Sequence, residues 1–156
     1  MKIFVGSDHA GFELKTALVT YLKSLGHEVE DKGAHEYDES DDYPDFIAPV
    51  AVEVSKNPEG ARGIILGGSG QGEAICANRF QNVRAAVFYG EVQSLAGEES
   101  IIELSRKHND ANVLSLGARF IREQEMLDAV HIWLETPFSG EEKHERRIRK
   151  LDNIHE

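Results

Sequence analysis

Glycines crowd one short segment of the chain, directly ahead of a carboxylate. Four of the six residues at 67–72 (GGSGQG) are glycine, and Glu73 and a predicted helix over 74–80 follow them. Glycines let successive backbone N–H groups turn inward, and a helix N-terminus adds partial positive charge. The pattern is neither G-x-G-x-x-G nor a Walker A loop, because Glu73 stands three residues after Gly70 and no Gly-Lys-Ser/Thr follows. The segment therefore predicts an oxyanion-binding loop and disfavours dinucleotide binding.

Glu73 is the residue of this segment that simple anion binding does not explain. A carboxylate there would repel a phosphate held by the same loop. It is better suited to a reaction in which Glu73 takes a proton next to a carbonyl while the loop stabilises the enediolate that forms. The alternative is that Glu73 is a first-turn acid that complements the helix dipole. Burial would raise the pKa of Glu73 and the helix end would lower it, and residue types leave that balance open.

A second polar pair, Asp8 and His9, directly follows the first apolar run of the chain. An adjacent carboxylate and imidazole at the end of a strand can hold and protonate a polar ligand. The alternative is that Asp8 or Ser7 caps the following helix. Both interpretations remain open on the residue types alone.

Two further groups carry charge near predicted element ends. His108 lies just before the fifth apolar run and Arg119 just after it, although His108 also fits an exposed helix end. The tail at 141–150 holds five of the seventeen cations, and Lys143 and Arg147 share one helix face at i, i+4. That face suits a phosphate monoester, and the alternative is a solvated helix with internal ion pairs.

The elements that must position these residues follow from hydrophobic patterning. Five short apolar runs are predicted strands, at 2–6, 27–31, 62–66, 84–89 and 112–116. The run at 27–31 alternates and predicts an edge strand, while the others lack strict alternation, as in strands covered on both faces. Segments 14–25, 43–54, 126–134 and 141–154 have helical periodicity, and Gly26 suits a helix end. This alternation predicts an α/β fold with a parallel sheet whose ligands bind beyond the strand carboxyl ends.

Composition sets limits on the class of protein. The chain has 156 residues and a formal net charge of −11, so we expect one domain over 1–156 and no nucleic-acid binding through a basic surface. The single cysteine, Cys76, predicts a small core residue and a reducing compartment, the cytoplasm. We expect no signal peptide and no membrane span. The acidic segment 35–45 predicts a solvated loop without the regular spacing of a cation site.

The motifs SDHAG, GGSGQGE, SRKHNDANVLSLGAR and KHERR run nearly end to end along the chain. With them the sequence resembles the ribose-5-phosphate isomerase B family, which includes allose-6-phosphate isomerase and the galactose-6-phosphate isomerase subunits. The resemblance implies a Rossmann-like three-layer αβα sandwich with a five-stranded parallel sheet and a C-terminal helix. It also implies a homodimer or dimer of dimers with shared sites, acting on a small sugar phosphate without metal or cofactor through a cis-enediolate.

The resemblance also assigns roles. Asp8 and His9 match the family's substrate-site pair, Ser69 its Ser/Thr position, and His108 the histidine that assists ring opening from the neighbouring subunit. The family's other substrate contacts fall on Gly68, Gly70, Gln71, Gly72, Asn109, Arg119, Lys143 and Arg147. In one branch of the family the base is a cysteine ending the third strand. That position is Gly67 here, so the chain resembles the branch whose base is the glutamate after the loop, Glu73.

Two departures from the family pattern bear on the substrate. Position 143 is Lys where Arg is expected, which keeps the charge but loses a bidentate fork. The stretch 90–100 is longer than expected and near the predicted site. The predicted function is interconversion of ribose 5-phosphate and ribulose 5-phosphate. The alternatives are an isomerase of a six-carbon sugar phosphate, a non-catalytic phosphosugar- or nucleotide-binding module, and a metal-dependent isomerase that shifts a hydride.

Overall fold

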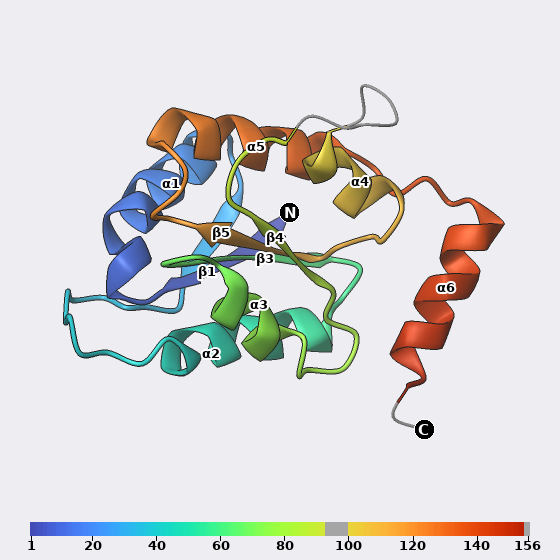
Figure 1. Ribbon diagram of the computed structural model, residues 1–156, viewed down its shortest axis with the longest axis horizontal. Helices are drawn as coiled ribbons and strands as arrows, with labels where there is room; N and C mark the ends of the chain where they lie inside the picture. The colour runs from blue at the N-terminus through green and yellow to red at the C-terminus, as the bar shows by residue number, and fades with distance from the viewer. Residues whose placement is uncertain (93–99, 155–156) are drawn as a thin grey trace.

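The apolar runs form one parallel sheet in the computed structural model, which describes residues 1–92 and 100–154. The strands are β1 (Lys2–Ser7), β2 (Glu28–Asp31), β3 (Ala61–Gly67), β4 (Ala85–Phe88) and β5 (Val113–Gly117). Their order across the sheet is β2-β1-β3-β5-β4, and every neighbouring pair is parallel. All strands therefore end at the same edge, on the left of Figure 1.

Helices cover both faces of this sheet. On one face lie α1 (Phe12–Ser24), α4 (Ile101–Lys107) and α5 (Glu123–Glu135), and on the other lie α2 (Pro44–Lys56) and α3 (Gln71–Ala77) (Figure 1). A short 3-10 helix, η1 (His9–Gly11), links β1 to α1, and α6 (Glu142–Asp152) stands apart on the right of the view. The predicted three-layer α/β sandwich with a five-stranded parallel sheet and a C-terminal helix is confirmed.

Two apolar cores, one on each face, hold the layers together. Alternation along β3 places Ile64 and Leu66 in one core with Trp133 of α5, and Ile65 in the other with Val50 of α2. All five side chains are fully buried. The central strands are thus covered on both faces, which is why their sequences lack alternation.

The predicted strands match the observed ones to within one residue at each end, and β2 is an edge strand as expected. Gly26 follows the end of α1 with φ +83°, a conformation that glycine adopts without strain. Leu25, however, belongs to the predicted apolar stripe but is 43% exposed. The charged Lys15 of the same helix is buried, and its Nζ donates hydrogen bonds to the Asp31 carboxylate and to the carbonyl of Ala34.

The C-terminal helix α6 makes little contact with the body of its own chain. His144 is its one buried residue, and Leu151 and the following Ile154 are exposed. Its links to the body include the Arg84–Asp152 ion pair, at 3.5 Å, and the stacking of His144 on His108. A helix so placed has an apolar side without cover in a single copy of the chain. Within the described ranges, no helix has the length and apolarity that crossing a membrane requires.

Candidate active site

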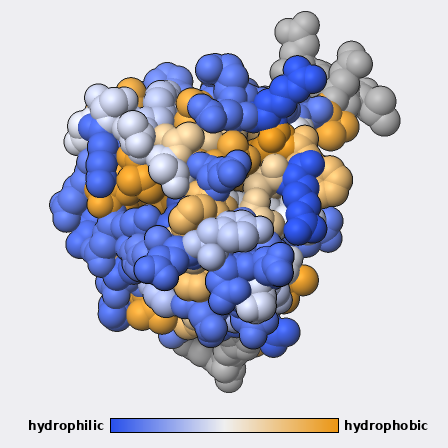
Figure 2. Space-filling view, turned by 90° about the vertical axis from the view of Figure 1, so that its left-hand side faces the viewer, coloured by the Kyte–Doolittle hydropathy of each residue, from blue (hydrophilic) through white to orange (hydrophobic). Residues whose placement is uncertain are grey.

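Three predicted site residues meet at the carboxyl edge of the sheet: Asp8, Glu73 and Arg119. This edge faces the viewer in Figure 2. Asp8 is buried at the N-cap of η1, and its Oδ1 accepts a hydrogen bond from the Ala10 N–H at 2.9 Å. Asp8 and the buried Glu73 are close enough for the Asp8 charge to raise the pKa of Glu73. Arg119 follows β5 and lies against Gly68, with its guanidinium carbon 3.5 Å from where a Cβ on that glycine would stand. The capping role of Asp8 is therefore confirmed, and its predicted part in holding a ligand stays a prediction.

The glycine-rich loop has the tight geometry that its composition predicts. Gly70 has φ +77° at the N-cap of α3, and a Cβ there would lie 3.0 Å from the Leu116 carbonyl carbon. The Ser115 hydroxyl donates a hydrogen bond to the Gly70 carbonyl, and the Ser69 hydroxyl accepts one from the Gln71 N–H at 3.3 Å. The loop is therefore fixed in place against the end of β5.

The Glu73 carboxyl group fills the space that Gly67 leaves by having no side chain. A Cβ at position 67 would overlap Oε1 and Cδ of Glu73 and lie 2.7 Å from Oε2. Real Cβ atoms do not approach that closely, so the two positions are sterically complementary. The end of β3 thus holds the carboxylate beneath the loop, with Glu73 only 4% exposed.

Burial decides the proton affinity of Glu73. Loss of solvation raises the pKa of this carboxyl group, and the negative charge of Asp8 raises it further. Hydrogen bonds from the backbone N–H groups of Glu73 and Gly70 lower it but do not outweigh burial. The result is a carboxylate more basic than an exposed glutamate, which suits a group that must take a proton from carbon.

Because its pKa is raised in the fold, Glu73 should destabilise the protein once it ionises. The cost is absent below the unfolded value, near pH 4.5, and grows as pH rises through the folded value. We expect Glu73→Gln to raise the free energy of unfolding by about 0.5–2 kcal/mol at pH 7 and by much less at pH 4. Urea unfolding at both pH values measures this difference. Equal gains at both pH values, or a loss at pH 7, would contradict it.

His9 bonds to a residue that the sequence placed in a solvated loop. Asp41 Oδ1 accepts from the backbone N–H of His9 at 3.1 Å and lies 2.6 Å from His9 Nδ1. The other five acids of the 35–45 segment are exposed, as expected, but the Asp41 side chain is only 7% exposed. The prediction of a wholly solvated loop is therefore wrong at Asp41, because η1 lies against this part of the loop.

Within the described part of the chain, one group of side chains has the atoms that could bind a metal ion. It consists of Asp8, His9 and Asp41, whose potential ligand atoms lie within 4.8 Å of one another. His9 Nδ1 and Asp41 Oδ1 are occupied by their mutual hydrogen bond. We assign no metal to this group.

The other predicted site residues lie at the opposite end of the sheet. His108 and Asn109 precede β5, whereas Arg119 follows it, and Lys143 and Arg147 are on α6 (Figure 1). His108 stacks on His144, with ring centroids 4.2 Å apart and planes 12° from parallel. Lys143 pairs with Glu141 at 2.8 Å. One copy of the chain therefore holds the predicted site residues in two separate groups, one with Glu73 and one with His108.

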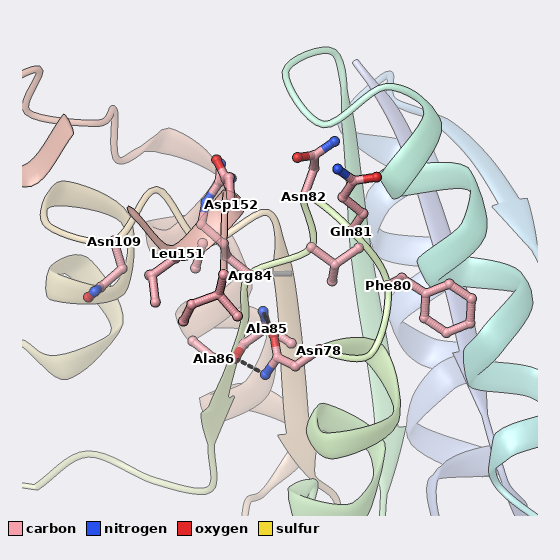
Figure 3. A pocket seen from close by; sticks show the side chains of 13 residues that line it. Asn78, Phe80, Gln81, Asn82, Arg84, Ala85, Ala86, Asn109, Leu151 and Asp152 are labelled. Atoms are coloured by element: carbon pink, nitrogen blue, oxygen red, sulfur yellow. Dashed lines mark hydrogen bonds and ion pairs between the residues drawn. The ribbon is translucent and has the colours of Figure 1, made fainter. Parts of the chain in front are cut away.

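A cavity of about 420 Å³ opens beside the group of residues that includes His108, between the end of α6 and the edge strand β4 (Figure 3). Arg84, Ala86, Asn109, Leu151 and Ile154 contribute to its lining. Asn78 covers the edge of β4 there, since its amide donates to the Ala85 carbonyl and accepts from the Ala85 N–H. The cavity thus lies away from Glu73, and no motif in the sequence predicts it.

Two other expectations have different outcomes. Cys76 is only half-buried beside the α2–α3 core, so the prediction of a core residue is right in place but not in degree. Of the long 90–100 stretch, residues 93–99 lie outside the described residues.

Comparisons with known proteins agree with this architecture. The family model for Ribose/Galactose Isomerase matches residues 3–151. Ribose-5-phosphate isomerase B of Mycobacterium tuberculosis (strain CDC 1551 / Oshkosh) is 41% identical over 148 residues, covering 95% of this chain and 86% of that protein. The crystal structure of ribose-5-phosphate isomerase B from Mycoplasma genitalium, with bound ribulose-5-phosphate, superposes with a TM-score of 0.89 at 36% identity. It covers 98% of this chain and 95% of its own. The Clostridium thermocellum enzyme gives a TM-score of 0.87 at 41% identity, covering 99% and 97%. This chain therefore belongs to the ribose/galactose isomerase family.

Proposed function

We propose that this protein interconverts ribose 5-phosphate and ribulose 5-phosphate by proton transfer. The observation that carries the proposal is the buried Glu73 carboxylate, seated on Gly67 beneath a glycine-rich loop. The M. genitalium relative was crystallised with ribulose-5-phosphate, and the relatives compared above are named as ribose-5-phosphate isomerases. A loop that only bound phosphate would gain nothing from a carboxylate directed at its anion, which argues against a non-catalytic module.

In the proposed reaction, Glu73 removes the proton from C2 of the open-chain aldose. The C2–H electron pair forms a C1–C2 double bond, and negative charge develops on O1, where the donors of Gly68, Ser69, Gly70, Gln71 and Gly72 stabilise it. A proton then moves from O2 to O1, and Glu73 returns its own proton to C1. The product is the ketose, with Glu73 ionised again.

The remaining roles rest on the family resemblance and on charge. His108, assisted by Asp8, moves the proton that opens the furanose ring. Asn109 contacts the sugar, and His9, Arg119, Lys143 and Arg147 bind the phosphate. Four of these residues lie at the far end of the sheet from Glu73: His108, Asn109, Lys143 and Arg147. We therefore propose that a second copy of the chain brings its own four residues to the Glu73 edge.

Such sharing requires a homodimer, or a dimer of dimers, in which each site draws on two copies. The exposed apolar side of α6 and the cavity beside it are consistent with an interface of this kind. We further propose one domain over 1–156. With Cys76 as the chain's single cysteine, we also propose a reducing compartment, the cytoplasm.

The decisive assay is formation of ribulose 5-phosphate from ribose 5-phosphate, with EDTA present, beside a panel of allose and galactose 6-phosphates. We expect turnover of the five-carbon substrate, unaffected by the chelator. Turnover restricted to a six-carbon phosphate would overturn the substrate assignment. Activity that disappears on chelation and returns with metal would favour a hydride shift instead of proton transfer.

Mixing two inactive variants tests whether copies share sites. When Glu73→Gln and His108→Ala subunits exchange at random in a dimer, about a quarter of the sites combine an intact Glu73 with an intact His108. We therefore expect the mixture to recover about a quarter of wild-type activity. Activity that stays at the level of the separate variants, after exchange is verified by mass spectrometry of tagged subunits, would count against sharing.

A further inference from the structure

Asp41 combines a buried carboxylate with a single ion-pair partner. Its side chain is 7% exposed, and among the described residues it pairs with His9 alone. Its second oxygen, Oδ2, is buried and has no hydrogen-bond partner there. Leaving a carboxylate charge buried is costly unless a cation and hydrogen bonds compensate it. In this part of the molecule, His9 is the residue that compensates the buried charge of the Asp41 carboxylate.

The bonds between the two residues fix both the position and the proton of the imidazole. Asp41 Oδ1 accepts from the His9 backbone N–H at 3.1 Å and lies 2.6 Å from Nδ1, which therefore carries a proton toward the carboxylate. The His9 side chain is still 24% exposed, and the Tyr37 ring lies nearly perpendicular to the imidazole at a centroid distance of 6.4 Å. Because Nδ1 is hydrogen-bonded to Asp41, Nε2 is the ring nitrogen that can bind a ligand.

A neutral ring held in this way would present an acceptor at Nε2, which repels a phosphate oxygen. Only the doubly protonated ring donates to Asp41 and to an anion at the same time. The charged groups around the ring are Asp8, Asp38, Asp41 and Arg119. The hydrogen bond to Asp41 contributes most to raising the pKa of His9, Asp8 adds to it, and Arg119 opposes it.

The loop that carries Asp41 is itself held in shape. The Asp41 N–H donates to the Asp38 carbonyl, and the Asp38 carboxylate accepts from both the N–H and the hydroxyl of Ser40. At the start of the same connection, Lys15 bonds to Asp31 and to the Ala34 carbonyl. The carboxylate is thus set against His9 by a structured turn.

We propose that Asp41 is a positioning residue for substrate binding, which orients His9 and holds it as an imidazolium whose Nε2–H faces the phosphate of the sugar phosphate. This inference rests on the proposed function for its substrate. It assigns to the acidic loop a part in recognising an anion, through a histidine that screens the loop's own charge.

A double-mutant cycle tests the proposal. We expect Asp41→Asn to raise KM for ribose 5-phosphate about tenfold at pH 7.5, the size of one charge-assisted hydrogen bond, with kcat changed less than about threefold. In a His9→Gln background the same change should alter KM by less than about twofold, because the residue it acts through is gone. The matched control is Asp42→Asn, which removes the same charge from the exposed neighbouring acid and should leave KM unchanged.

Several results would overturn the proposal: an equal effect of Asp41→Asn in both backgrounds, an equal effect of Asp42→Asn, or a loss confined to kcat. A second measurement needs no variant, in case Asp41→Asn folds poorly. The nitrogen chemical shifts of the His9 ring in the wild type should show protons on both Nδ1 and Nε2, and inorganic phosphate should perturb Nε2. A neutral ring, with a proton on only one of its two nitrogens, would contradict the proposal even if the enzyme acted on another sugar. Absence of ribose 5-phosphate turnover with the expected shifts would instead overturn only the proposed function.

Discussion

Replacing Glu73 by Gln is expected to lower kcat for ribose 5-phosphate at least about 100-fold, while KM changes less than about threefold. Glutamine has the same shape, so it fits the space above Gly67, but it cannot take a proton from C2. The loss should therefore fall on the chemical step and spare binding. Steady-state kinetics with EDTA present, together with exchange of the C2 proton into solvent, measure both quantities.

The control for this variant addresses the alternative that Glu73 only complements a helix end. Glu123 is an exposed acid in the first turn of α5, and Glu123→Gln removes a comparable interaction with a helix N-terminus. We expect it to retain full activity. A Glu73→Gln enzyme that keeps both turnover and proton exchange would remove Glu73 from the centre of the mechanism.

Gly67→Ala is expected to reduce kcat by a similar factor, about 100-fold, although alanine has no chemistry of its own. The added Cβ would occupy the position of the Glu73 carboxyl group, so the carboxylate must leave its place above the end of β3. Overpacking of this buried site should also lower the free energy of unfolding by about 1–3 kcal/mol. Kinetics and urea unfolding of the same preparation measure the two effects.

Two further variants separate displacement of the base from general damage. Gly60 lies just before the other end of β3, where a new Cβ would meet only the end of the Asn57 side chain, so Gly60→Ala should stay active. Adding Glu73→Gln to Gly67→Ala should cost little more activity than either change alone. Additive losses in kcat would mean that Gly67 acts by a route other than Glu73.

The fold was largely readable because its signals are local. Apolar runs predict the central strands to within one residue, since a strand buried on both faces must be apolar throughout, and alternation predicts the edge strand β2. Helix α4 was not predicted as an element. It is only seven residues long, too short for periodicity to identify.

Residues of the candidate site could be predicted where both the residue type and its place after a predicted strand or loop indicate a function. Glu73 stands out because a carboxylate conflicts with an anion-binding loop, and Asp8 because it directly follows a strand. Asp41 could not be found in the same way, because it is one acid among six and only the packing of η1 singles it out. The separation of His108 and Glu73 within one copy follows from the predicted parallel sheet, because His108 precedes a strand and Glu73 follows one.

The fit between Gly67 and Glu73 also constrains how such a site can evolve. In the branch that this chain does not resemble, a cysteine takes the position of Gly67. A cysteine introduced here would bring its Cβ into the space of the Glu73 carboxyl group. Losing Glu73, the proposed base, first would leave a site with neither the glutamate nor the cysteine. A lineage that exchanges one base for the other must therefore pass through an intermediate with impaired activity, or change both codons together. The two forms should thus persist as separate lines of descent.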